Sequence, residues 1–239
     1  MELEKITDSR NGPSRRRYDD ACGTAHALDL IGERWALLVM RELMLGPKRF
    51  SDIRADLPGI SANTLTQRLE GLEANGLVVR RRLPPPVSAQ VYELTEWGYE
   101  AEPIVQVMGR WATRSPAHDP TMPLSGTSLM LSFRTMGDPA RMKGVKGRIG
   151  FLIGAETFLV TIDDGRIEAV RGPVAGADLV FTGLAPVIAG AVYGGVPIEA
   201  LEAEGALKVE GDRALAARFV TLFPLPPKAE LPASAASPR

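Results

Sequence analysis

The chain has very few of the residues that bind metals or cross-link a fold. It contains one cysteine, Cys22, and two histidines among 239 residues. A single cysteine excludes an intrachain disulfide and favours a reducing compartment. Cys22, His26 and Asp29 lie close together on an expected helix, but a metal site needs more ligands than this group supplies. We therefore expect no bound metal and no cofactor.

Long apolar runs and enzyme motifs are also missing. No run approaches the roughly 20 residues of a membrane span. The first residues, MELEKITDSRNG, lack the apolar core of a signal peptide. The chain has no GxSxG or HExxH motif and no phosphate-binding glycine loop in a strand–loop–helix context. These absences predict a cytoplasmic protein that is not an enzyme and has no membrane partner.

Charge is nearly balanced over the chain but not along it. The net charge is −1, whereas residues 34–82 hold nine Lys or Arg against five Asp or Glu, an excess of four positive charges. Arginines 15–17 add to this within residues 1–18, which we expect to form a flexible basic arm. A basic island is the footprint of a nucleic-acid partner, and a solvated charged surface is the alternative.

Apolar spacing and turn residues predict a specific order of elements in the first half. The pattern predicts helices at about 22–31, 35–45, 50–57 and 61–75, strands at 76–83 and 90–95, and a helix at about 96–113. The second of these helices is apolar on nearly all sides and should belong to the core. Ser61 is a suitable N-cap for the fourth helix. This order, with a short turn between the third and fourth helices, is typical of a winged helix-turn-helix.

The helix at 61–75 has two contrasting faces. Leu65, Leu69 and Leu72 recur at helical spacing and should be buried. Asn63 and Gln67 lie on the opposite face, and their side-chain amides are the groups that read base edges in a major groove. A wetted polar surface is the alternative, but the neighbouring elements favour DNA.

Residues 20–114 resemble the HxlR family of bacterial winged-helix transcription regulators. The resemblance rests on ALDLIGERWALLVMRELMLGPKRFSDIRADLPGISANTLTQRLEGLEANGLVVR and VYELTEWGYEAEPIVQVMGRW. It implies a homodimer that is joined by its first and last helices and binds a palindromic operator in double-stranded DNA. The dimer should depend on an apolar stripe of Trp97, Ile104, Met108 and Trp111.

The candidate DNA contacts come from the short helix, the recognition helix and the wing. The wing loop PPPVSAQ lacks the basic residue usual in this family, so phosphate contacts from the wing are expected either to be weaker or to pass to three consecutive arginines. The full set is Lys48, Arg49, Ser51, Ser61, Asn63, Thr64, Gln67, Arg68, Arg80, Arg81, Arg82 and Gln90.

Cys22 is a candidate redox sensor. It matches a cysteine at the start of the first helix in HxlR-type regulators, which in some members senses electrophiles or oxidants. A helix N-terminus favours the thiolate, whereas Asp19 and Asp20 oppose it. The alternative is a small buried thiol without a redox function.

The second half changes to short β-like runs. After a linker at 118–123, runs at 128–135, 148–154, 157–172 and 177–183 are interpreted as strands, with a hairpin turn at Asp164-Gly165. Two helices, a strand and a closing helix follow, which indicates an α+β domain. The Pro/Ala/Ser-rich tail, 224–239, is expected to be disordered.

Residues 126–223 resemble the sterol-carrier-protein domain. Gly205, Leu207-Lys208-Val209, Gly211-Asp212 and Leu222-Phe223 carry the resemblance. It implies a sheet backed by helices around an apolar tunnel, although the segment before the first strand is short and the helices at the tunnel mouth are expected to be missing. A solid core is the alternative. The candidate tunnel residues, placed on the strands and the apolar helix, are Leu131, Phe133, Phe151, Ile153, Phe158, Val160, Phe181, Ile188 and Val192.

The combined expectation is an α+β chain with an arm (1–18), a winged-helix domain for DNA binding and dimerisation (19–117), a sterol-carrier-like domain (126–223) and a tail. We expect a dimeric transcription regulator whose second domain binds an apolar small molecule and thereby changes operator affinity. One alternative is a lipid-carrier or acyl-handling protein in which the winged helix only dimerises. Another is a DNA-binding protein whose second domain only packs the dimer.

Overall fold

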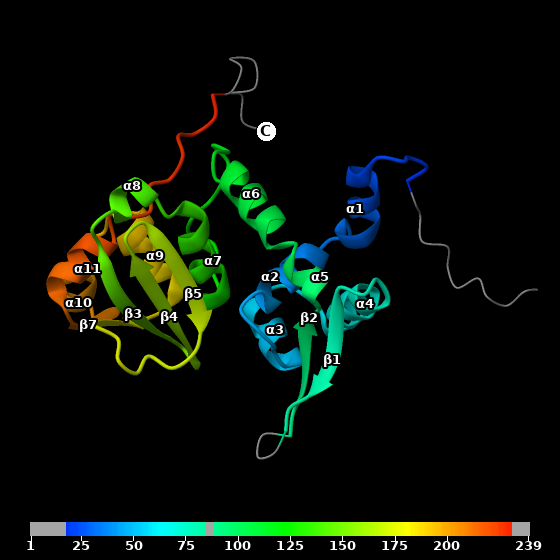
Figure 1. Cartoon of the computed structure of the whole chain (residues 1–239), viewed down its shortest axis with the longest axis horizontal. Coiled ribbons are helices and arrows are strands. Elements are labelled where there is room, and N and C mark those ends of the chain that lie inside the picture. Colours follow the sequence, from blue (N-terminus) through cyan, green and yellow to red (C-terminus); the bar gives the residue numbers. More distant parts are fainter. Residues whose placement is uncertain (1–17, 85–87, 231–239) are drawn as a thin grey trace, which may run out of the picture.

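The computed structural model of the chain describes residues 18–84 and 88–230. A helical first region with a two-stranded hairpin lies beside a second region built on a five-stranded sheet (Figure 1). The α+β class is confirmed. Buried apolar side chains from both regions form one continuous cluster, so the two regions share a core. Apart from Tyr18, the expected arm lies outside the described residues.

The first region follows the order expected of a winged helix. Its elements are α1 (Gly23–Ile31), α2 (Ala36–Leu43), α3 (Phe50–Asp56), α4 (Ala62–Ala74), β1 (Val78–Arg82), β2 (Gln90–Leu94), α5 (Glu96–Tyr99) and α6 (Glu102–Ala112). The Ser61 hydroxyl accepts a hydrogen bond from the Thr64 backbone N–H at 3.1 Å, which confirms it as the N-cap of α4. Leu65, Leu69 and Leu72 are buried, as expected.

Two predictions for the first region need correction. The helix expected at 96–113 is two helices, because α6 restarts with Pro103 in its first turn, a position where proline's missing N–H costs nothing. Helix α2 belongs to the core, as expected, but one side of it is exposed. Leu38 is 39% exposed, while the charged Glu42 is fully buried.

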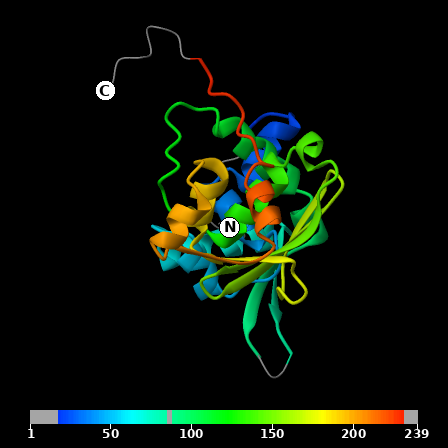
Figure 2. The same cartoon turned by 90° about the vertical axis from the view of Figure 1, so that its left-hand side faces the viewer.

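The hairpin β1–β2 projects from the body of the molecule in two perpendicular views (Figures 1 and 2). Its strands are antiparallel, with Arg80 opposite Tyr92 and Arg82 opposite Gln90. The backbone of Lys48 also pairs with Tyr92, through N···O distances of 3.0 and 2.9 Å. This bridge ties the base of the hairpin to the start of α3.

The second region is a sheet with helices packed against it. Its elements are α7 (Gly126–Met136), α8 (Pro139–Met142), β3 (Lys146–Ile153), β4 (Glu156–Asp163), β5 (Arg166–Arg171), β6 (Leu179–Gly183), α9 (Ala185–Tyr193), α10 (Ile198–Ala203), β7 (Leu207–Gly211) and α11 (Arg213–Phe219). The strand order is β5-β4-β3-β6-β7, and only the β3–β6 pair is parallel. Asp164 and Gly165 both have positive φ, which confirms the hairpin turn between β4 and β5.

The segment predicted as the first strand of this region is instead helix α7. Ser125 caps it by accepting a hydrogen bond from the Ser128 backbone N–H at 3.0 Å. Most of its residues are buried, because α7 packs between the sheet and helices α2 and α6. A helix buried on nearly all sides shows no amphipathic period, so a short apolar run does not distinguish it from a strand. Consequently Leu131 and Phe133 lie on a helix, and helices α7 and α8 precede the first strand.

Aromatic rings fill the centre of the second region. The Phe133 ring lies 4.7 Å from Phe223 and 5.3 Å from Phe219, and Phe151 stacks on Phe181 at 5.5 Å between centroids. Such packed rings are the usual content of a solid core. At its edge, the Tyr193 hydroxyl and the Ser132 hydroxyl are 2.7 Å apart, and burial raises the pKa of Tyr193.

The tail differs in part from its prediction. Residues 224–230 form no helix or strand, but they are held against the end of α6. The Lys228 ammonium donates to the carbonyls of Thr113 and Ser115 at 3.0 and 3.1 Å, and the Ala229 N–H donates to Arg114 O at 2.7 Å. Residues 231–239 lie outside the described part. Among the described residues, no helix has the length and apolar character needed to cross a membrane.

Candidate nucleic-acid interface

The exposed face of α4 carries polar side chains. Asn63 and Gln67, one helical turn apart, are both exposed, and Thr66 lies exposed beside them. Thr66 was not among the predicted contacts, although the spacing from Asn63 places it on the same face. This group lies near the capped N-terminus of α4, the part of a recognition helix that reaches base edges.

Three predicted contacts near α4 are partly engaged within the protein. Thr64 is half-buried, and its hydroxyl lies 2.8 Å from that of Ser61. Arg68 is half-buried, and its guanidinium pairs with Glu33 at 3.3 Å. Ser61 itself remains exposed. Of these, Ser61 is the most accessible to a ligand.

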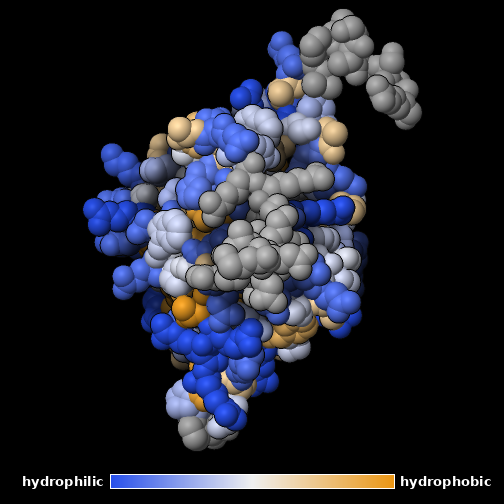
Figure 3. Space-filling model, turned by 90° about the vertical axis from the view of Figure 1, so that its right-hand side faces the viewer, coloured by the Kyte–Doolittle hydropathy of each residue, from blue (hydrophilic) through white to orange (hydrophobic). Residues whose placement is uncertain are grey.

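The wing arginines differ in what they contact. Arg80 pairs with Glu73 at 3.3 Å and lies over the Tyr92 ring, whereas Arg81 pairs with Glu93 at 2.8 Å on the other face of the hairpin. Arg82 is exposed next to the hairpin tip, and it forms no ion pair with the described residues. Gln90 is exposed directly opposite Arg82. Hydrophilic side chains gather around the base of the hairpin on this face (Figure 3).

The start of α3 corrects one predicted contact. Arg49 and Ser51 are exposed, and the Ser51 hydroxyl donates to the Asp52 carboxylate at 3.0 Å. Lys48 is only 3% exposed. Its ammonium lies inside the protein among carboxylates, so the expectation that Lys48 contacts DNA is not met.

Lys48 is the centre of a buried ion cluster. Its ammonium pairs with Glu42 of α2 at 3.1 Å, with Asp56 of α3, and with Glu156 of β4 at 3.2 Å. Burial lowers the pKa of Lys48, but the three carboxylates together outweigh burial and raise it. Burial raises the pKa of Asp56, and the hydrogen bond from Lys48 opposes this change.

Arg171 of β5 joins the cluster from the second region. Its guanidinium pairs with Glu156 at 3.2 Å and donates to Thr127 Oγ1 at 3.1 Å. It also donates to the carbonyls of Gly46 and Pro47 at 3.4 and 3.3 Å. These carbonyls immediately precede Lys48 in the chain. The second region therefore contacts the start of the helix-turn-helix through both a cation and a carboxylate.

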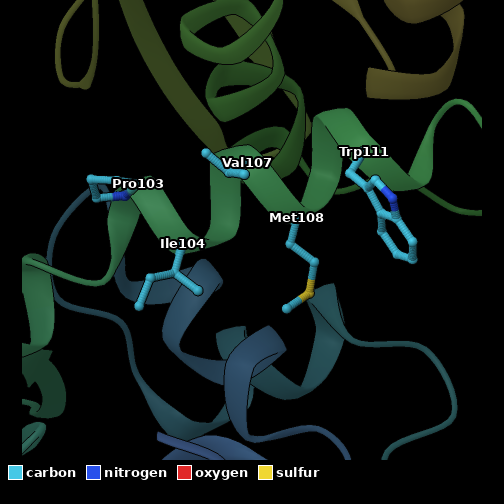
Figure 4. A pocket seen from close by; sticks show the side chains of 5 residues that line it. All are labelled: Pro103, Ile104, Val107, Met108 and Trp111. Atoms are coloured by element: carbon cyan, nitrogen blue, oxygen red, sulfur yellow. The ribbon is translucent and has the colours of Figure 1, made fainter. Parts of the chain in front are cut away.

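Helix α6 faces the protein with its polar side. Arg134 of α7 donates to both carboxylate oxygens of Glu102 at 2.7 Å, and Arg110 donates to Thr135 O at 3.3 Å. The apolar side is exposed: Ile104, Met108 and Trp111 project together from the helix (Figure 4). We call Ile104, Val107, Met108 and Trp111 the α6 stripe. Their exposed fractions run from 45% to 72%.

The α6 stripe continues into a cleft towards α1. This cleft is lined by Leu30 and Ile31 of α1, Trp97 of α5 and Ile104 of α6. Leu28 on α1 is 46% exposed and Trp97 is 48% exposed. The cleft and the α6 stripe share Ile104, so apolar side chains of α1, α5 and α6 form one continuous exposed surface on the first region.

Cys22 is exposed at the N-cap of α1. The N–H groups of Thr24 and Ala25 and the Thr24 side chain, at the start of α1, lower the pKa of its thiol. The alternative of a buried cysteine is therefore not met. His26 is also exposed and lies one turn along the same helix.

The nine candidate tunnel residues are all buried in the second region. Phe133, Phe151 and Phe181 belong to the packed aromatic cluster, and the Phe158 ring lies under the Arg171 guanidinium at 5.8 Å. These contacts favour the solid-core alternative. The ligand-binding role of the nine residues stays a prediction.

Two family models match successive parts of the chain. Residues 30–119 match the HxlR-like helix-turn-helix family, and residues 130–224 match the SCP-2 sterol transfer family. The first match covers α2, the helix-turn-helix, the hairpin and α6. The second covers the sheet and its helices.

Relatives align with the first region. The uncharacterized HTH-type transcriptional regulator YvaP of Bacillus subtilis is 38% identical over 87 residues, which are 36% of this chain and 81% of YvaP. The HTH-type transcriptional regulator YodB of the same species is 42% identical over 86 residues, which are 36% of this chain and 77% of YodB. These identities extend over most of each relative.

One solved structure, the reduced form of YodB from B. subtilis, is 38% identical and covers 41% of this chain and 98% of its own, with a TM-score of 0.37. The redox regulator HypR in its oxidized form is 34% identical and covers 41% of this chain and 100% of its own, with a TM-score of 0.38. With the family match and the two curated relatives, the conclusion is that this chain belongs to the HxlR-like helix-turn-helix family of transcriptional regulators and carries a C-terminal SCP-2 region.

Proposed function

We propose that this protein is a homodimeric transcription regulator that binds a palindromic operator. The observation that carries the proposal is the exposed polar face of α4, formed by Asn63, Thr66 and Gln67 beside the projecting hairpin. In a helix-turn-helix, side chains at the start of the recognition helix read the major groove, and the wing contacts the backbone. Because a regulator acts where the chromosome is, we place the protein in the bacterial cytoplasm.

The α6 stripe and the adjoining cleft support the dimer. An exposed stripe of large apolar side chains marks an interaction surface, and a second copy presents the same stripe for a self-complementary contact. Two recognition helices related by such a dyad read half-sites about 34–36 Å apart on the duplex. The proposed function thus uses α4 for readout and α6 for pairing.

Binding to the protein's own promoter tests the function. Fluorescence anisotropy of the full chain with promoter duplexes and with shuffled duplexes, over a salt series, is expected to show sequence preference and an affinity that falls with salt. The alternative of a lipid carrier, with a winged helix that only dimerises, predicts no salt-sensitive binding to either duplex. Equally weak binding to all duplexes would contradict the proposal that the protein recognises a specific operator sequence.

Arg82 is expected to contact a phosphate. Arg82→Ala should weaken binding to the operator and to shuffled DNA alike, and reduce the salt slope by about one unit, because one counterion-releasing contact is lost. Arg166→Ala, which changes an exposed arginine at the start of β5, is the matched control and should leave the slope unchanged. If Arg82→Ala leaves the salt slope unchanged, Arg82 is an exposed side chain that does not contact a phosphate.

A second candidate function is electrophile or oxidant sensing by Cys22, which its exposure and the neighbouring Thr24 and Ala25 groups favour. Because these groups stabilise the thiolate, alkylation by iodoacetamide should rise at lower pH than for a cysteine peptide. Thr24→Ala removes one donor and should move the profile back towards higher pH. Identical profiles for the protein and the peptide would contradict a sensor thiol. An adduct on Cys22 would lie at the start of α1, and α1 lines the cleft that adjoins the α6 stripe in the proposed dimer surface.

Modulation by an apolar small molecule is the remaining part of the proposal. A ligand would have to displace rings that now contact one another, such as Phe151 and Phe181. A melting temperature that rises with added sterols or fatty acids supports the effector. Unchanged melting with all of them favours the alternative of a DNA-binding protein whose second domain only packs the dimer.

A further inference from the structure

The second region contacts the helix-turn-helix through the buried ion cluster around Lys48. Glu156 at the start of β4 pairs with Lys48, which in turn pairs with Glu42 of α2 and Asp56 of α3. Figure 1 shows β5 and α7 on the side of the second region that faces α2 and α3. The Ser125 hydroxyl, just before α7, also donates to Glu42 at 2.8 Å. A single buried ammonium therefore links elements of both regions.

The backbone of Lys48 extends this link to the DNA-facing elements. It pairs in both directions with Tyr92 of the wing strand β2. The next residue, Arg49, is the exposed N-cap of α3. The positions of the wing base and of Arg49 thus depend on where the Lys48 ammonium is held.

We propose that Lys48 is a positioning residue for DNA binding. Glu156 of the second region holds its ammonium, and Arg171 holds Glu156 and the carbonyls of Gly46 and Pro47, so that this region braces Arg49 and the wing in the binding geometry. The inference rests on the proposed DNA-binding function. It assigns the SCP-2 region a role that requires no ligand. The charges in the cluster balance, since Glu42, Asp56 and Glu156 face Lys48, Arg41 and Arg171.

Glu156→Gln is the sharpest variant. It keeps the side-chain shape and removes one charge, and it leaves Lys48 with two carboxylates, so the fold should persist. Lys48→Met is less suitable, because it leaves buried carboxylates without the positively charged partner that they share and would destabilise the fold. The matched control is Glu168→Gln on the neighbouring strand β5, where the side chain is exposed.

In the full chain, Glu156→Gln is expected to reduce operator affinity about fivefold or more, the lower range for coupled sites, and to lower the salt slope by about one unit. Arg49→Ala alone should lower the slope similarly. Because both changes act on the same contact, Arg49→Ala should add little in the Glu156→Gln background. Additive losses, or an unchanged slope in Glu156→Gln, would overturn the brace.

Hydrogen exchange of the DNA-free protein separates this inference from the proposed function. Glu156→Gln should speed exchange in α3 and at the base of β2, while α9 and α11 keep wild-type protection. Wild-type protein that binds no DNA would sink the proposed function, and the exchange pattern would still report on the brace. Exchange equal to wild type in α3, or raised evenly over the whole chain, would refute the brace even if DNA binds.

Discussion

Ile104→Glu is expected to produce monomers in sedimentation and to abolish tight operator binding. Ile104 is 45% exposed and lies where the α6 stripe meets the cleft towards α1, so a carboxylate there would be buried without a partner in the proposed dimer. Loss of the second recognition helix removes the gain from paired binding, which is about 10²–10⁴-fold in affinity. Sedimentation velocity and anisotropy on the same samples measure both effects.

Leu184→Glu is the matched control for this experiment. Leu184 is 64% exposed just before α9 and lies outside the stripe and the cleft, so the same chemical change should leave the dimer intact. The melting temperature of Ile104→Glu shows whether the monomer remains folded. Dimers that persist at normal operator affinity in Ile104→Glu would place the interface elsewhere.

Gln67→Ala is expected to cost about 1–3 kcal/mol on the cognate operator and much less on shuffled DNA, because a bidentate amide contact discriminates one base pair. Gln67 is exposed on α4, so truncation should change the melting temperature little. Affinities for operators substituted at each position measure the effect. The variant should lose discrimination at one position in each half-site.

Arg82→Ala provides the contrast to Gln67→Ala. A phosphate contact carries no sequence information, so its loss should reduce affinity for all duplexes alike. Gln67→Ala with equal losses on cognate and shuffled DNA would remove Gln67 from base readout. Asn63→Ala, one turn earlier on the same face, would then be the next residue to test.

Local patterns in the sequence were sufficient for most elements of the first region, although they did not divide the expected helix at 96–113 into α5 and α6. The cap at Ser61, the leucines of α4 and the strand at 90–94 depend on residues within a few positions of one another, so spacing alone predicts them. The turn at Asp164-Gly165 follows from the positive φ that these residues tolerate. The exposed apolar stripe of α6 was likewise predictable from its spacing.

Tertiary contacts decided the features that local patterns did not contain. The sheet and the helices around segment 126–136 bury nearly all sides of it, so its sequence has no polar face that would show the period of a helix. Within the second region, the rings that fill its centre come from α7, β3, β6 and α11, and only their packing distinguishes a solid core from a tunnel.

Lys48 shows the same limit within the candidate interface. In the sequence it belongs to a basic stretch and resembles a phosphate contact, but its partner Glu156 is more than a hundred positions away. The Ser125 hydroxyl that contacts Glu42 is 83 positions from it. The amino-acid sequence by itself determined which side chains carry a charge. Which of these charges are buried and paired was decided by the packing of the second region against the first, because residues so far apart in the sequence meet only after the chain has folded.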